Sequence, residues 1–195
     1  MSRLKPSLGL IQIITQNFLS AANTLTVVRL ALAPAILWAI VEQRYFVGLF
    51  VFTIAVITDV MDGRLARRQG TESKLGGLLD HATDCIFVVC GLFALSRHAI
   101  VPLALSALVA VAFIQYMLDS GVLKKKGLVP NKIGRWNGIA YFVLVAVPLV
   151  QNSFNFQLFN DHQIYVAGWA MCAMTAVSML DRVSLFFRKS RPRQD

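Results

Sequence analysis

The sequence predicts an all-α, polytopic membrane protein with six transmembrane helices and an N-terminal interfacial helix. Hydrophobic residues make up 56% of the 195 residues, and the mean hydropathy is +0.62, whereas soluble domains are about 45–50% apolar. Apolar stretches of about 20 residues, the length of a membrane-spanning helix, recur along the chain. Lys and Arg gather between alternate stretches, as they do in cytoplasmic loops of membrane proteins.

The first 22 residues mix apolar and polar side chains and contain no acidic residue. This pattern predicts a helix lying against the membrane surface. A cleaved signal peptide is disfavoured because polar residues from Gln12 to Asn17 interrupt a short apolar core. We therefore expect an amphipathic segment over 1–22, a membrane domain over 23–187 and a basic cytoplasmic tail over 188–195.

Six apolar stretches form the predicted membrane domain. Their ranges are 23–43, 45–65, 77–97, 99–120, 136–152 and 164–187. Cys85, Cys90 and Cys172 fall inside these stretches without CxxC spacing, so we expect them to act as small apolar residues. No disulfide or zinc site is predicted.

The basic residues predict an integral protein of the cell membrane with both termini in the cytoplasm. Fifteen of the 19 Lys and Arg residues fall on one side of the predicted spans, and only Arg44 and Arg97 clearly fall on the other. This bias, with attraction to anionic lipid headgroups, accounts for the net charge of +9. Nucleic acid is not an expected partner because the basic clusters lack the patterning of recognition modules.

Four aspartates lie among the apolar residues of the second and third stretches. They are Asp59, Asp62, Asp80 and Asp84. Spacings of three and four residues place each pair on one helix face, and the short segment between the pairs allows them to converge. Carboxylates inside a membrane are costly unless they are paired or bind metal. They are therefore the predicted functional site, with an active site opening to the cytoplasm.

Converging carboxylates repel one another by several kcal/mol, so a divalent cation or protonation must neutralise them. Oxygen ligands without a suitably spaced His or Cys favour Mg²⁺, with Mn²⁺ or Ca²⁺ as substitutes. On a helix, the side chain of His81 would point in a different direction from that of Asp80. We therefore expect His81 to pack against other residues or to support the metal ligands. Arg67 lies about two turns beyond Asp59 and could meet a diphosphate.

The segment from Asp59 to Asp84 matches the signature D-x2-D-G-x2-A-R-x8-G-x3-D-x3-D at every defined position. It therefore resembles the CDP-alcohol phosphotransferase (CDP-alcohol phosphatidyltransferase) family. This resemblance implies a six-helix homodimer that transfers a lipid-phosphate group, such as the phosphatidyl group of CDP-diacylglycerol, to an alcohol. By the same resemblance, CMP would be released and the lipid bilayer would supply the donor.

The resemblance also implies roles for particular residues. The four aspartates would hold two Mg²⁺ ions, for which Mn²⁺ can substitute, and Asp84 would also accept the proton of the attacking hydroxyl. The CDP-lipid would contact Gly63, Arg67 and Ser73. The segment NTLTVVR at 23–29 resembles the start of the family's first helix, which adds Asn23, Thr26 and Arg29 to this set.

The acceptor is less constrained by the sequence. Chain length and the NTLTVVR segment resemble enzymes that make phosphatidylglycerophosphate, which indicates glycerol 3-phosphate. However, DHATDC stands where those enzymes carry D-P-x-A-D-K, and DHxxD is similar to members using choline or ethanolamine. Inositol phosphate, serine and phosphatidylglycerol are further alternatives. Lys132 and Arg135, before the fifth stretch, are candidates to bind an acceptor phosphate, although such residues can simply anchor a loop at anionic lipid.

A transporter is the alternative of a different class. Intramembrane carboxylates can relay protons or ions, but they are then expected near the middle of a crossing path. Here the four acids fall near one end of two stretches, with a matched Gly and Arg, so an enzyme is the favoured interpretation.

Overall fold

The computed structural model describes the backbone of residues 21–69, 74–119 and 132–190, and the side chains of 27–61, 77–118 and 134–184. Within these ranges the chain forms six α-helices and no strand, which confirms the all-α prediction. The helices are α2 (Ala21–Val41), α3 (Tyr45–Gln69), α4 (Lys74–Ser96), α5 (Leu103–Asp119), α6 (Lys132–Ser153) and α7 (Asp161–Ser190). Residues 1–20, most of the predicted interfacial helix, lie outside the described residues.

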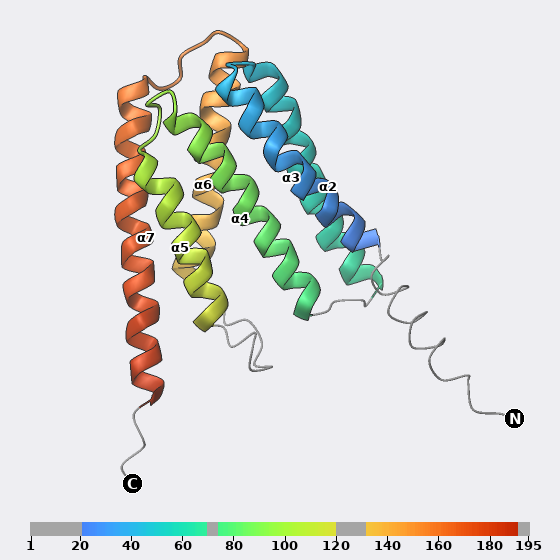
Figure 1. Ribbon diagram of the computed structural model, residues 1–195, viewed down its shortest axis with the longest axis vertical. Helices are drawn as coiled ribbons and strands as arrows, with labels where there is room; N and C mark the ends of the chain where they lie inside the picture. Colours follow the sequence, from blue (N-terminus) through green and yellow to red (C-terminus); the bar gives the residue numbers. More distant parts are fainter. Residues whose placement is uncertain (1–20, 70–73, 120–131, 191–195) are drawn as a thin grey trace, which may run out of the picture.

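Consecutive helices run in opposite directions within one bundle (Figure 1). Helix α2 packs against both α3 and α4, α5 packs against α4 and α7, and α6 packs against α3, α4 and α7. Among the described residues, α3 and α4 share no comparable contact of their own. The first helix of the bundle therefore joins the two helices that carry the aspartates.

The interior of the bundle is apolar. Ile36, Phe87, Leu92 and Leu149, from three different helices, are fully buried in one cluster. The outside of the bundle is apolar as well, since every helix exposes large apolar side chains. Examples are Val27, Phe50, Leu79, Ile114, Val143 and Leu180. Exposed apolar patches of this extent mark a surface that meets lipid or another protein.

Two helical stretches, Gly77–Ser96 and Asp161–Ser184, are long and apolar enough to cross a membrane by length and composition. Three shorter apolar stretches, Val27–Val41, Tyr45–Met61 and Leu103–Leu118, occur in α2, α3 and α5. The prediction of six helices is therefore confirmed for the described residues. Two of these helices meet the length and composition criteria for a membrane span, so the prediction that all six cross the membrane stays a prediction.

The predicted helix boundaries agree with the observed ones to within four residues. The predicted start of the fourth stretch at 99 is early, because α5 begins at Leu103. Ala99 adopts a left-handed backbone conformation with φ of 56°, which a helix cannot include, and Pro102 precedes the first residue of α5. At the other end of the chain, α7 continues to Ser190, three residues past the predicted domain boundary at 187.

Candidate active site

Three of the four predicted aspartates meet around one arginine. Arg29 on α2 places Nη1 2.7 Å from Oδ1 of Asp80 and 2.8 Å from Oδ1 of Asp84, both on α4, and donates a hydrogen bond to each. Its Nη2 lies 3.1 Å from Oδ1 of Asp59 on α3. One guanidinium therefore joins carboxylates from two other helices.

The local sequence explains this convergence. Asp80 and Asp84 are four residues apart, so both project from the same face of α4. Because α2 packs against both α3 and α4, a side chain on α2 can reach acids on either helix. The predicted convergence of the aspartates on these two helices is thus present, and the guanidinium of Arg29 on α2 lies between them.

The four side chains differ strongly in exposure. The side chain of Arg29 is 1% exposed, while those of Asp59, Asp80 and Asp84 are 42%, 37% and 22% exposed. Arg29 therefore lies beneath the carboxylates, which present their remaining surface outward. A ligand can reach the aspartates without entering a closed cavity, and Asp84 is the most shielded of the three.

The donor set fits a hard divalent cation. Asp59, Asp80 and Asp84 each offer a carboxylate oxygen, and these oxygens lie within 4.8 Å of one another. Carboxylate oxygens are the ligands of Mg²⁺, Mn²⁺ and Ca²⁺. The guanidinium of Arg29 shows that the same carboxylates can surround a positive charge.

Several predicted site residues lie where the structure does not describe side chains. They are Asn23, Thr26, Asp62, Gly63, Arg67, Ser73 and Lys132. Arg135 is described and lies exposed in the first turn of α6. The suggested contacts of these residues with metal, donor or acceptor stay predictions.

A second polar group lies beside the aspartates. The ring of His81, on α4, meets the ring of Tyr116, on α5, edge to face with centroids 6.0 Å apart. The guanidinium carbon of Arg182, on α7, lies 4.5 Å from the centroid of Tyr116, a cation–π distance. Nη2 of Arg182 lies 3.5 Å from the position that a Cβ on Gly134 would occupy. Arg182 therefore lies between Tyr116 on α5 and the start of α6.

The position of Tyr116 between His81 and Arg182 was not predicted from the sequence. Helical periodicity places it on α5 but does not distinguish it from the apolar residues around it. A sequence signal was present in the polar residues near the ends of the fourth and sixth stretches, where Asp119 and Arg182 indicate that these ends approach a polar region. The aromatic ring between His81 and Arg182 links them.

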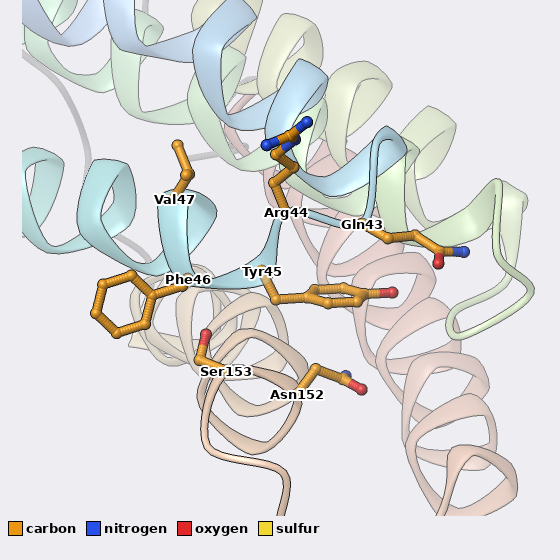
Figure 2. A pocket seen from close by; sticks show the side chains of 7 residues that line it. All are labelled: Gln43, Arg44, Tyr45, Phe46, Val47, Asn152 and Ser153. Carbon is orange, nitrogen blue, oxygen red and sulfur yellow. The ribbon is translucent and has the colours of Figure 1, made fainter.

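A separate depression lies at the opposite end of the bundle. It measures about 280 Å³ and is lined by the turn between α2 and α3 and by the end of α6. Figure 2 shows that its side chains point in different directions, with Phe46 on one side, Tyr45 and Gln43 on the other, and Arg44 directed away from Asn152 and Ser153. These side chains do not converge on a common point, so the aspartate cluster is the better candidate for chemistry.

The family model for CDP-alcohol phosphatidyltransferase matches residues 19–181. This match over most of the chain indicates a transferase, and the acidic cluster is its candidate metal centre. The chain belongs to the CDP-alcohol phosphatidyltransferase family, as its signature had indicated.

Comparison with curated proteins agrees with this assignment. A cardiolipin synthase (CMP-forming) of Streptomyces coelicolor is 30% identical over 80% of this chain and 75% of its own length. A chloroplastic CDP-diacylglycerol–glycerol-3-phosphate 3-phosphatidyltransferase of Oryza sativa subsp. japonica is 25% identical over 92% of this chain and 60% of its own. The cardiolipin synthase (CMP-forming) of Homo sapiens is 27% identical over 72% and 54%. No solved structure matches.

Proposed function

We propose that this protein transfers the phosphatidyl group of CDP-diacylglycerol to an alcohol and releases CMP. The observation that carries the proposal is the meeting of Asp59, Asp80 and Asp84 around a single positive charge in a chain of this family. Phosphoryl transfer places negative charge on the attacked and leaving oxygens, so a cluster that gathers cations suits this reaction.

The aspartate oxygens fit a pair of Mg²⁺ ions, for which Mn²⁺ can substitute, with Asp62 as the fourth ligand. When bound, such ions would stabilise negative charge on the diphosphate. The aspartates would hold the two ions at the partly exposed ends of α3 and α4. No His or Cys is within the described set of close ligand atoms, which favours hard cations.

The proposed reaction needs one side chain of the protein to accept a proton. The acceptor hydroxyl oxygen bonds to the phosphorus that carries the diacylglycerol, the bond from that phosphorus to the CMP oxygen breaks, and the hydroxyl proton passes to a carboxylate. We assign this role to Asp84, the least exposed of the three acids, because a shielded base competes less with water. The cytidine diphosphate would contact Asn23, Thr26, Gly63, Arg67 and Ser73, with Arg29 near its phosphates.

Phosphatidylglycerol and glycerol 3-phosphate are the two acceptors that the relatives favour. Cardiolipin contains two phosphatidyl groups on one glycerol, so a CMP-forming synthesis from CDP-diacylglycerol requires phosphatidylglycerol as acceptor. The Streptomyces coelicolor relative has that activity, and the rice relative uses glycerol 3-phosphate. We place phosphatidylglycerol first because the bacterial relative is the more similar in sequence.

Both acceptors carry a phosphate, which a cation beside the aspartates would bind. Arg182 lies against Tyr116 and next to Gly134, and Arg135 is exposed one residue further along α6. We propose that these two arginines and Lys132 provide a basic approach to the site. Choline and ethanolamine carry a positive charge, so this basic surface favours an anionic acceptor over them.

The membrane arrangement follows from surface and charge. Large apolar side chains are exposed on all six helices, which suits a bundle that spans the bilayer. The bias of Lys and Arg supports an orientation in which both termini and the active site face the cytoplasm. A donor lipid can then reach the aspartates from the bilayer. A homodimer completes the proposed assembly.

The test is a CMP-release assay on the purified protein with CDP-diacylglycerol and Mg²⁺. Phosphatidylglycerol, glycerol 3-phosphate, inositol phosphate, serine, choline and ethanolamine are offered separately. We expect release with phosphatidylglycerol, or with glycerol 3-phosphate if the second acceptor is correct. Absence of CMP with every acceptor contradicts the proposed function.

The matched variant is Asp62→Asn, which removes one proposed ligand charge with almost no change in size. We expect turnover to be lost while the helical circular dichroism spectrum stays the same. Full turnover in this variant would mean that the ions are held without Asp62.

A further inference from the structure

We propose that Arg29 is the built-in counter-ion of the metal site, and that divalent cations bind by displacing its guanidinium from the aspartates. Arg29 is in this sense a positioning residue: it keeps Asp59, Asp80 and Asp84 together when no divalent cation is bound. The inference deepens the proposed function, on which its metal component rests.

The geometry of Arg29 supports a role beyond helix packing. Its two terminal nitrogens reach carboxylates on both α3 and α4, at 2.7 to 3.1 Å. A guanidinium has a rigid fork of donors, which can hold more than one carboxylate at once. The same three carboxylates are the close ligand set for a cation. Arg29 and a divalent cation therefore use the same partners.

Burial makes this pairing energetically necessary. The side chain of Arg29 is 1% exposed and follows Val27 and Val28 on a largely apolar helix. A buried charge is costly unless it is paired and hydrogen-bonded. Conversely, three carboxylates gathered within 4.8 Å repel one another unless a positive charge lies between them. Each half of the cluster thus stabilises the other.

Displacement also gives Arg29 its second task. Once cations neutralise the aspartates, the guanidinium loses its strongest partners while it remains at the base of the site. An incoming diphosphate supplies new oxygens for the same fork. Exchange of partners from carboxylate to phosphate would explain how one residue can both stabilise the protein without metal and bind the donor.

Competition and simple structural support predict opposite changes in metal affinity. If Arg29 competes with the cation, its removal strengthens the field of the aspartates and metal binds more tightly. If Arg29 only holds the ligands in a binding arrangement, its removal lets them separate and metal binds more weakly. The sign of the change therefore decides between the two roles.

The experiment measures Mn²⁺ binding to the full-length protein in detergent, by the electron paramagnetic resonance signal of free Mn²⁺, without donor or acceptor. For Arg29→Gln we expect an affinity about tenfold or more above that of the unaltered protein. We also expect a lower thermal unfolding midpoint in a chelator and a larger rise in this midpoint on adding Mn²⁺. Arg97→Gln, an exposed arginine just beyond α4, is the control and should leave all three values unchanged.

Arg29→Lys keeps the inference testable if the Gln variant does not fold. Lysine keeps the charge but its single ammonium cannot span three carboxylates as the guanidinium does. We expect a smaller increase in Mn²⁺ affinity than for Gln. Weaker binding in either variant, or no Mn²⁺ binding to the unaltered protein, overturns the inference. If the affinities change as expected but no acceptor yields CMP, the proposed function fails while the role of Arg29 stands.

Discussion

The two ends of the helix bundle hold the chain together in different ways. At one end, short connections join α2 to α3, α4 to α5 and α6 to α7, and each contains a residue with a left-handed backbone: Gln43, Ala99 and Asn155. Backbone hydrogen bonds close these turns, as between the amide of Ile100 and the carbonyl of Leu95 at 3.2 Å. At the other end, side-chain ion pairs join α2, α3 and α4 around Arg29.

The turn end therefore contributes mainly to stability, and the aspartate end to the proposed chemistry. The turn end relies on backbone geometry and close packing, which any residue of suitable size and conformation can supply. The aspartate end relies on specific charges that are costly to bring together and are partly exposed to a ligand. Matched substitutions at the two ends should therefore have different consequences.

The largest expected effect comes from Asp84→Asn at the aspartate end. This change removes a ligand charge and the proposed proton acceptor, so we expect the rate of CMP release to fall at least about a hundredfold, which corresponds to about 2.7 kcal/mol of transition-state stabilisation. The measurement is the initial rate with CDP-diacylglycerol and the accepted alcohol.

The control is the same chemical change at the turn end, Asp161→Asn. Asp161 begins α7 and lies exposed in its first turn, where loss of its charge should cost only about 0.3–1 kcal/mol of helix stability. We expect its activity to stay within about twofold of the unaltered protein. Equal losses in both variants would mean that Asp84 acts through folding and not through the site.

The next effect concerns close packing at the turn end. A Cβ on Gly168, in α7, would lie 2.5 Å from Cδ of Pro102, which precedes α5. Small residues of this kind let helices approach closely, so Gly168→Ala forces the two segments apart. We expect a loss of about 1–3 kcal/mol in the free energy of unfolding, measured by denaturant titration in mixed micelles.

Gly138→Ala is the matched control for this change. A Cβ on Gly138, in α6, meets nothing within 4 Å, and alanine is the better helix former by up to about 1 kcal/mol. We expect this variant to be as stable as the unaltered protein or slightly more so. An unchanged stability for Gly168→Ala would show that α7 and the turn before α5 can separate at little cost.

The sequence predicted the helices better than their turns. Apolar stretches of spanning length located all six helices because the side-chain environment, inside and outside the bundle, is apolar throughout. The start of α5 was misplaced because nothing in the apolar pattern marks Ala99 as left-handed. A backbone conformation held by neighbouring hydrogen bonds leaves no signal in the hydropathy of the residue that adopts it.

The site was predicted in part for a similar reason. Carboxylates among apolar residues are conspicuous, and helical spacing correctly paired Asp80 with Asp84. The partner of these acids was not evident, because Arg29 lies 51 and 55 residues earlier in the chain and periodicity carries no information on which helices pack together. The position of Tyr116 between His81 and Arg182 required the same knowledge of helix packing.

The smallest expected effect tests whether the turn end stores backbone strain. Ala99 has φ of 56°, a conformation that costs a residue with a side chain about 1–2 kcal/mol. Ala99→Gly removes this cost, but the greater freedom of glycine in the unfolded chain offsets about 0.5–1 kcal/mol of it. We therefore expect a net gain of about 0.5 kcal/mol in the free energy of unfolding, with the rate of CMP release unchanged. A loss of stability would show that the turn is held in place by neighbouring contacts of the Ala99 side chain, and a change in rate would show that the turn end influences the aspartates through α4.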